Sequence, residues 1–197
     1  MLLVVVGSAQ PTAGQAEAPD GIPPGQWRCW WQPGNVPCNA RLYGLDMLSA
    51  DDGWAVGWHG TIMRWDGTVW RPVDSPTRSH LNAVSMAAPD DGWAVGEQTM
   101  LHWDGAAWTR APTPRCALNA VAMVSATDGW AVGDCILRWN DSAWDPVFSP
   151  TWSALSSVAL LSAQDGWAVG AGSAFLHWDG QVWANMNAAL IGQGHSV

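Results

Sequence analysis

The chain has 197 residues, of which 48% are hydrophobic and 13% are charged, and its formal net charge is −9. This composition excludes a disordered, highly charged chain. The acidic balance also argues against a nucleic-acid-binding protein, which needs a basic face, and against docking on anionic lipid. No segment approaches the roughly 20 apolar residues of a membrane span.

The N-terminal segment resembles the back half of a secretory signal peptide, although the positively charged start of such a signal is missing. Residues 2–6 form a short apolar run, and small residue pairs typical of a cleavage site follow at Gly7/Ala9 and Gly14/Ala16. We therefore expect residues 1–24 to be a signal-peptide-like leader or a disordered tail. The first alternative places the protein outside the cytoplasm, secreted or in the cell envelope.

The four cysteines fit such an export route. Cys29 and Cys38 flank a Pro-Gly loop, whereas Cys116 and Cys135 lie further along the chain. Neither pair has the short spacing of a zinc site. We expect two disulfides, 29–38 and 116–135, while the sequence leaves other pairings and free thiols open.

A single six-residue word organises most of the chain. Asp-Gly-Trp-Ala-Val-Gly begins at Asp52, Asp91, Asp128 and Asp165. The starts of the word are 39, 37 and 37 residues apart. A nearly fixed period of this size indicates a solenoid or propeller array. We expect repeats that start near residues 42, 81, 118 and 155, within a propeller domain of residues 25–190 that is followed by a tail at 191–197.

Each repeat contains four predicted strands. The first begins with Leu and alternates bulky with small residues, as expected for an inner strand crowded near a propeller axis. The second is the Gly-Trp-Ala-Val-Gly word, which carries no charge and should be buried. The third ends in a Trp, and the fourth begins with a Trp across a tight hairpin. Pro72 and Pro146 place the fourth strand on the sheet edge, because proline cannot donate to a ladder.

These features predict an all-β fold, a β-propeller of four-stranded antiparallel blades. The Trp residues of the repeat should form most of the core, since each can bury about 150–250 Å². Ring closure is left open among three arrangements. The four repeats close as a small ring, or form an open arc that a homodimer completes, or belong to a truncated reading frame.

Polar positions recur with the repeat and have structural explanations. The residue before the last Trp of the third strand should lie on a solvated outer face; it is Arg64, His102, Arg138 or His177. The repeated Asp before Gly should cap turns. His102 and His177 fall on separate blades and should not converge, so we predict no metal and no cofactor.

The repeat resembles that of photosystem II stability/assembly-factor-like propellers, and of the wider set of bacterial BNR (Asp-box) repeat proteins. The resemblance lies in Gly-Trp-Ala-Val-Gly followed by Thr61–Trp70, and it extends over about residues 42–186. Asp66-Gly67, Asp104-Gly105, Asp179-Gly180 and Asn140-Asp141 take the place of the Asp-box turn, which is one residue shorter here. The resemblance implies an extracytoplasmic assembly or binding protein, seven-bladed in the photosynthetic members.

BNR repeats also occur in sialidases, which need an Arg cluster for a carboxylate and a Tyr nucleophile helped by an acid. The only Tyr here is Tyr43, in an inner-strand position, and beyond the leader the only Glu is Glu97. We therefore predict no catalytic residues and no enzyme activity.

The predicted function is an exported, non-catalytic scaffold that binds another protein. Function usually sits in loops over a rigid scaffold. The loops that join fourth to first strands and second to third strands should meet at one mouth of the propeller. The candidate binding residues in those loops are Trp58, His59, Arg78, His80, Glu97, Arg115, Asp134 and Trp152. The alternatives are a carbohydrate-binding module that uses exposed Trp and, less favoured, a sialidase-like glycosidase.

Overall fold

The computed structural model describes residues 41–112 and 115–187, and there it is an all-β protein of four separate four-stranded antiparallel sheets. The first blade contains β1 (Leu42–Met47), β2 (Gly53–Gly57), β3 (Ile62–Trp65) and β4 (Trp70–Pro72). The second contains β5 (Leu81–Ala88), β6 (Asp91–Gly96), β7 (Thr99–Trp103) and β8 (Trp108–Arg110). The third contains β9 (Leu118–Ser125), β10 (Asp128–Gly133), β11 (Ile136–Trp139) and β12 (Trp144–Val147). The fourth contains β13 (Leu155–Ser162), β14 (Asp165–Gly170), β15 (Phe175–Trp178) and β16 (Trp183–Asn185).

The strand order within each sheet follows the chain and confirms the predicted blade. The repeated word forms the second strand, which is buried throughout in the first blade because no polar side chain interrupts it. The fourth strand pairs only with the third. Pro72 and Pro146 therefore lie on a sheet edge, where the missing N–H leaves no ladder partner unpaired.

Antiparallel pairing gives every blade two different ends. At one end lie the connections from second to third strands and from fourth strands to the next blade, which we call the loop end. At the other lie the two tight hairpin turns of each blade, which we call the turn end. Two turns of 3₁₀ helix, η1 (Trp58–Gly60) and η2 (Ala171–Ser173), belong to the loop end.

The inner strands pack side by side in chain order, β1 on β5, β5 on β9 and β9 on β13. Asn82 Nδ2 donates to the carbonyl of Leu118, and Asn119 Nδ2 donates to that of Leu155, both at 2.8 Å. These bonds align the starts of successive inner strands, so equivalent loops of the four blades lie at the same end of the molecule.

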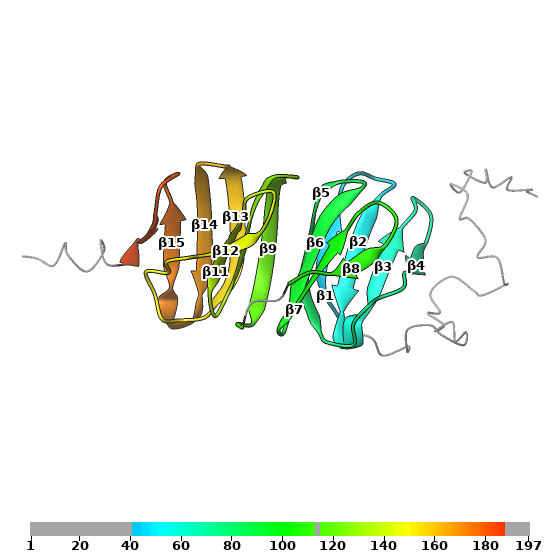
Figure 1. Ribbon diagram of the computed structural model, residues 1–197, viewed down its shortest axis with the longest axis horizontal. Coiled ribbons are helices and arrows are strands. Elements are labelled where there is room, and N and C mark those ends of the chain that lie inside the picture. The colour runs from blue at the N-terminus through cyan, green and yellow to red at the C-terminus, as the bar shows by residue number, and fades with distance from the viewer. Residues whose placement is uncertain (1–40, 113–114, 188–197) are drawn as a thin grey trace, which may run out of the picture.

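The described blades form an open arc. No comparable packing joins β13 to β1, and the first and last blades lie at opposite ends of the molecule's long axis (Figure 1). Of the three arrangements that the sequence leaves open, a closed four-bladed ring is therefore wrong for this structure. The apolar side chains that would meet in a closed ring stay exposed, since Leu45 of β1 is 62% exposed and Val169 of β14 is 43% exposed.

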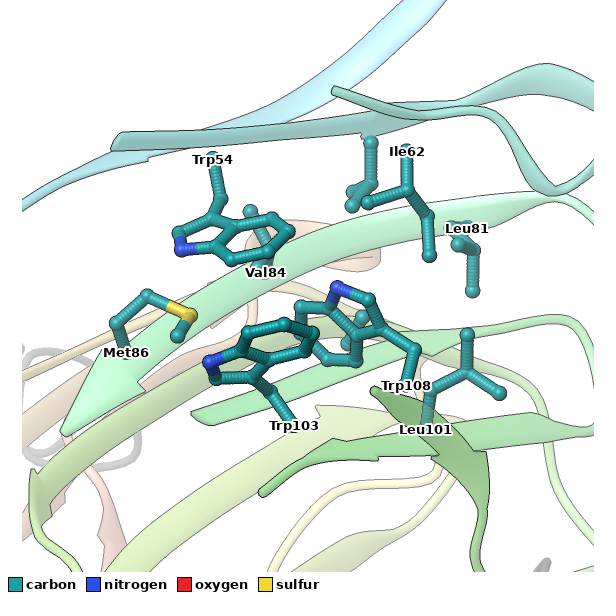
Figure 2. Close-up of a cluster of buried hydrophobic side chains, with 10 residues drawn as sticks. Trp54, Ile62, Leu81, Val84, Met86, Leu101, Trp103 and Trp108 are labelled. Carbon is teal, nitrogen blue, oxygen red and sulfur yellow. The ribbon is translucent and has the colours of Figure 1, made fainter. Parts of the chain in front are cut away.

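The core lies between blades, in three clusters of buried side chains. In the cluster between the first two blades, Trp54 of one blade packs against Trp103 and Trp108 of the next (Figure 2). Apolar side chains of the inner strand, such as Leu81 and Val84, complete it. The repeat Trp residues thus do form the core, as predicted, and they do so by joining neighbouring sheets.

One sequence expectation is wrong. The polar residues of the third strands are not on a solvated outer face, since all four are partly buried and each bonds the Asp that opens the repeated word. Arg64 Nε lies 3.1 Å from Asp52, and His102 Nε2 lies 2.6 Å from Asp91. Arg138 and His177 pair with their Asp in the same way. The third strand pairs with the second, so their polar side chains meet across the ladder, over the ring of the second-strand Trp.

Several expectations fall on residues outside the described ranges. These are the leader at 1–24, the domain ends at 25 and 190, the tail at 191–197 and the Cys29–Cys38 pair. In the part of the chain that is described, no helix has the length and apolarity needed to cross a bilayer.

Candidate binding surface at the loop end

Backbone hydrogen bonds tie the two kinds of loop together at the loop end. In the first, third and fourth blades, the residue after the repeated word donates its N–H to the carbonyl that precedes the inner strand. The pairs are Trp58 to Arg41, Asp134 to Ala117 and Ala171 to Ala154, at 2.8 to 3.0 Å. The predicted meeting of these loops is therefore present in the fold.

The glycine that ends the repeated word permits this close approach. A Cβ on Gly96 would collide with the backbone carbonyl oxygen of His80, and a Cβ on Gly133 would collide with that of Ala117. Since backbone cannot move aside cheaply, a side chain here would push the two loops apart.

Three of the predicted residues gather with Tyr43 into one group, which we call the aromatic loop cluster (Tyr43, Trp58, His59, His80). The rings of Trp58 and His59 lie 4.1 Å apart, and the His80 ring lies 6.0 Å from Trp58 and 5.5 Å from His59. Tyr43 meets His80 edge-on at 6.5 Å. The cluster joins the first blade to the loop that enters the second, and it remains partly open to solvent.

The backbone at His59 is held in the left-handed region, with φ of 53°, inside the short turn η1. Its N–H donates to His80 Nδ1 at 3.1 Å, a bond that needs this ring nitrogen to act as acceptor. His tolerates this conformation better than a β-branched residue would. The bond fixes the relative position of the two rings at the loop end.

Charged side chains at the loop end are exposed and unpaired. Arg78, Glu97, Arg115 and Asp134 are all exposed, and none of them forms an ion pair with another described residue. Arg41, which precedes β1, is in the same situation. These groups are free to meet charges on a partner.

The turn end is different, because it gathers most Asp residues and its cations are already engaged. Arg64, Arg71 and Arg138 each pair with an Asp of their own blade. The unpaired guanidinium groups of the described chain thus lie mainly at the loop end.

The loop from the third to the fourth blade displays two bare aromatic side chains. Trp152 is fully exposed, and Phe148 is 83% exposed. The hydroxyl of Ser149 donates to the carbonyl of Thr151 and orders the loop between them. Exposed aromatic rings of this size, held by an ordered loop, are typical of contact surfaces.

The predicted disulfide between Cys116 and Cys135 is present. It joins the loop that enters the third blade to the turn after β10, beside the bond from Asp134 to Ala117. Arg115 and Asp134 are the sequence neighbours of these cysteines. The disulfide therefore holds the loop of Arg115 beside the loop of Asp134.

The structure brings Trp58, His59 and His80 together, and places the other predicted residues separately along the same end of the arc. Sequence reasoning missed Tyr43 and Phe148 as members of this surface. The sequence did contain a signal for Tyr43. It is the one aromatic residue at a position that is small and polar in the other three repeats, where Asn82, Asn119 and Ser156 stand. Among the described residues no group of three His, Cys, Asp or Glu is close enough to hold a metal.

The fold and these loops define a β-propeller whose blades present one loop-rich end. No protein-family model matches the chain, and a search of curated proteins finds no match. Among solved structures, YCF48 bound to D1 peptide is similar with 22% identity and a TM-score of 0.62, over 76% of this chain and 55% of that one. YCF48 from Cyanidioschyzon merolae is similar with 20% identity and a TM-score of 0.58, over 77% and 57%.

The WD40 repeats of RRP9 are also similar, with 13% identity and a TM-score of 0.62, over 75% of this chain and 51% of that one. At these identities the likeness concerns the propeller fold. The chain spans little more than half the length of each of these propellers. The assignment to BNR (Asp-box) repeats in particular stays a prediction.

Proposed function

We propose that this chain is an exported, non-catalytic propeller module that binds another protein through its loop end. The observation that carries the proposal is the combination found there. The aromatic loop cluster, two bare aromatic side chains and unpaired arginines share one end of a rigid scaffold, whereas the arginines of the turn end are paired with Asp.

The partner's chemistry follows from these groups. Arg41, Arg78 and Arg115 lie at the entries to the first three blades and present guanidinium groups that favour carboxylates. Trp58 and Trp152 offer flat apolar surface for side chains between those charges. An extended peptide segment that carries both carboxylates and apolar side chains matches this arrangement. The solved complex of YCF48 with a D1 peptide supports a propeller of this fold as a peptide receptor.

The positions of the Arg and Tyr residues that a sialidase would need disfavour a glycosidase. Arg64 and Arg138 lie in the first and third blades, each held by its own Asp, so they do not form a cluster around one carboxylate. Tyr43 packs against His80, away from both. The disulfide Cys116–Cys135 supports export, because such bonds persist in oxidising compartments.

The test is selection of peptides from a displayed library, followed by binding measurements with purified chain. We expect enriched peptides to combine acidic and apolar residues. Arg78→Ala with Arg115→Ala, and separately Trp58→Ala, should weaken binding at least about tenfold, which corresponds to about 1.4 kcal/mol. The matched control is Gln181→Ala at the turn end, which should leave the affinity unchanged.

Two outcomes would count against the proposal. Equal binding by the loop-end variants and the wild type would remove the loop end as the site. No enrichment of any peptide would remove peptide binding.

Carbohydrate binding is the second candidate, and the full exposure of Trp152 is the observation that favours it. Sugar rings stack on exposed indole faces much as other apolar surfaces do. A glycan array with wild type and Trp152→Ala separates the two functions. Hits that disappear in the variant would support a lectin-like module, and an array without hits would dismiss it.

A further inference from the structure

The joint between neighbouring blades is built the same way three times. The second-strand Trp of one blade packs on two Trp residues of the next blade, at 4.7 Å and at 5.2 or 5.3 Å between ring centroids. The sets are Trp54 with Trp103 and Trp108, Trp93 with Trp139 and Trp144, and Trp130 with Trp178 and Trp183. The second contact is edge-to-face in each case, a favourable geometry for aromatic pairs.

Each joint has two unlike faces. The trailing face of a blade contributes the Trp and Val of its second strand and the first apolar residue of its third. The leading face of the next blade contributes three apolar residues of its inner strand together with its two Trp. In the first joint, Trp54, Val56 and Ile62 meet Leu81, Val84 and Met86, and all six are buried (Figure 2).

No blade of the described residues packs on the leading face of the first blade. Its inner-strand residues Leu42, Leu45 and Met47 are 53%, 62% and 44% exposed. The equivalent residues of the second blade are at most 7% exposed. Trp65 and Trp70 pair with each other at 5.7 Å, and no second-strand Trp of another described blade packs on them.

The trailing face of the fourth blade is open in the complementary way. Val169 and Phe175 are 43% and 38% exposed, although their equivalents in the other blades are fully buried. Among the described residues, Trp167, the fourth second-strand Trp, has ring contacts only with Phe175 and His177 of its own blade. The two ends of the arc thus carry the two halves of one joint, and together they leave an apolar patch of the kind that marks an interface.

We propose that a second copy of this chain fills both ends, so that two four-bladed arcs close into one ring. Trp167 of each copy inserts between Trp65 and Trp70 of the other, and Leu45 packs against Val169. The joint is head-to-tail and occurs twice, and the ring axis is the two-fold axis, which makes the assembly closed.

Two further observations fit this occupant. The chain matches only 51–57% of the length of the propellers it resembles, so two copies supply about one full ring. In two of the three internal joints a third-strand Arg also spans the interface, since Arg64 lies over both Trp54 and Trp103, and Arg138 lies over both Trp130 and Trp178. His177 occupies the equivalent third-strand position in the fourth blade, with its ring 4.3 Å from that of Trp167, and would face Trp65 of the second copy.

The test uses sedimentation equilibrium of the full chain. Wild type should give twice the chain mass of 21.1 kDa. Leu45→Asp spoils the leading face, and Val169→Asp spoils the trailing face. Either should weaken dimerisation at least about 100-fold, because a carboxylate would be buried without a partner. Both positions are exposed within one arc, so circular dichroism should show that each variant folds. Val182→Asp, an exposed valine on a hairpin at the turn end, is the matched control and should remain dimeric.

A mixture of the two variants tests whether the trailing face of one copy binds the leading face of the other. Leu45→Asp copies keep a good trailing face and Val169→Asp copies keep a good leading face, so a tagged copy of one should capture the other through a single intact joint. Neither variant should capture itself.

Three results would overturn the proposal. The first is a folded wild-type chain that is still monomeric at about 100 µM, which would mean a dissociation constant above this concentration. The second is a dimer that survives both substitutions, which would mean another interface. The third is a series of larger species, which would mean an open head-to-tail chain. The peptide-binding test does not depend on any of these results.

Discussion

At the residue scale, the hairpins between third and fourth strands depend on one side-chain oxygen each. Asp104 Oδ1 accepts the N–H groups of Ala106 and Ala107, and Asp179 Oδ1 accepts those of Gln181 and Val182, all at 2.8 to 2.9 Å. These backbone hydrogen bonds lower the pKa of Asp104 and Asp179. Asn140 performs the same role in the third blade with its amide oxygen.

Asp66 holds the first hairpin in the same way, because it accepts the N–H groups of Thr68 and Val69, and hydrogen bonds from the Thr68 and Arg71 side chains lower its pKa. Acid should therefore destabilise three of the four hairpins. A carboxyl whose pKa is lower in the folded chain than in the unfolded chain contributes stability above its unfolded pKa, near 3.9, and loses it as pH falls through the folded pKa. We expect the free energy of unfolding to fall below about pH 4. Replacing Asp66, Asp104 and Asp179 by Asn should keep the turns, as Asn140 does, and reduce this fall. Urea unfolding at pH 7 and pH 3 measures the free energy of unfolding of the wild type and of the triple variant. An equal loss of stability between these pH values in the two proteins would contradict the prediction.

At the same scale, the pairs of Asp with Arg or His explain why Arg and His alternate at this position of the third strand. Arg138 lies over Trp130, and His102 stacks on Trp93 at 4.5 Å, each bonded to the Asp of its blade. This position requires a flat hydrogen-bond donor that covers the indole of the second-strand Trp and reaches the carboxylate of the Asp that opens the repeated word. A guanidinium and an imidazole both meet it.

At the element scale, the two glycines of the repeated word have different roles, although they belong to the same strand. A Cβ on Gly96 would strike backbone of the neighbouring loop at His80. A Cβ on Gly92 would mainly meet the end of the Met86 side chain. Methionine has three rotatable bonds and adapts its shape.

Gly96→Ala should therefore cost more stability than Gly92→Ala. We expect a loss of about 1–3 kcal/mol for Gly96→Ala, the usual range for overpacking that must shift backbone, and a smaller loss for Gly92→Ala, its matched control in β6. Denaturant unfolding measures both. Peptide binding of the folded Gly96→Ala variant should also weaken, because the His80 loop moves. Equal costs at the two positions would show that the loops do not depend on this approach.

At the scale of the whole molecule, the blades pack one after another in a line. Loss of an interior joint should therefore lower the free energy of unfolding more than a change at either end of the arc. The main packing between described blades joins neighbours, β1 with β5, β5 with β9 and β9 with β13, and stability in such arrays is close to a sum of unit and interface terms. Trp93 and Trp130 fill interior joints, whereas Trp167 faces outward from the arc.

Alanine at the equivalent Trp positions tests this coupling. We expect Trp93→Ala and Trp130→Ala each to cost about 3–5 kcal/mol, as large core truncations do. Trp167→Ala should cost clearly less when assembly is blocked by Leu45→Asp. Thermal or urea unfolding of the three variants in that background makes the comparison. A Trp167→Ala loss as large as the interior ones would mean that the fourth blade's outer face is already covered within a single chain.

The sequence by itself determined the blade. Strand periodicity, the uncharged word, the turn residues and the edge prolines Pro72 and Pro146 are local signals, and each acts within a few residues of itself. The repeat made these signals visible four times. The sequence suggested the Cys116–Cys135 pair and left other pairings open, and the structure contains that disulfide.

Only the tertiary structure decided how distant side chains meet. Asp52 and Arg64 pair because of the register between β2 and β3. Tyr43 reaches His80 because two blades lie side by side. The open arc, with unlike faces at its two ends, depends on the rotation from each sheet to the next. That rotation arises from the packing of whole sheets through their Trp joints, and no short stretch of sequence records it.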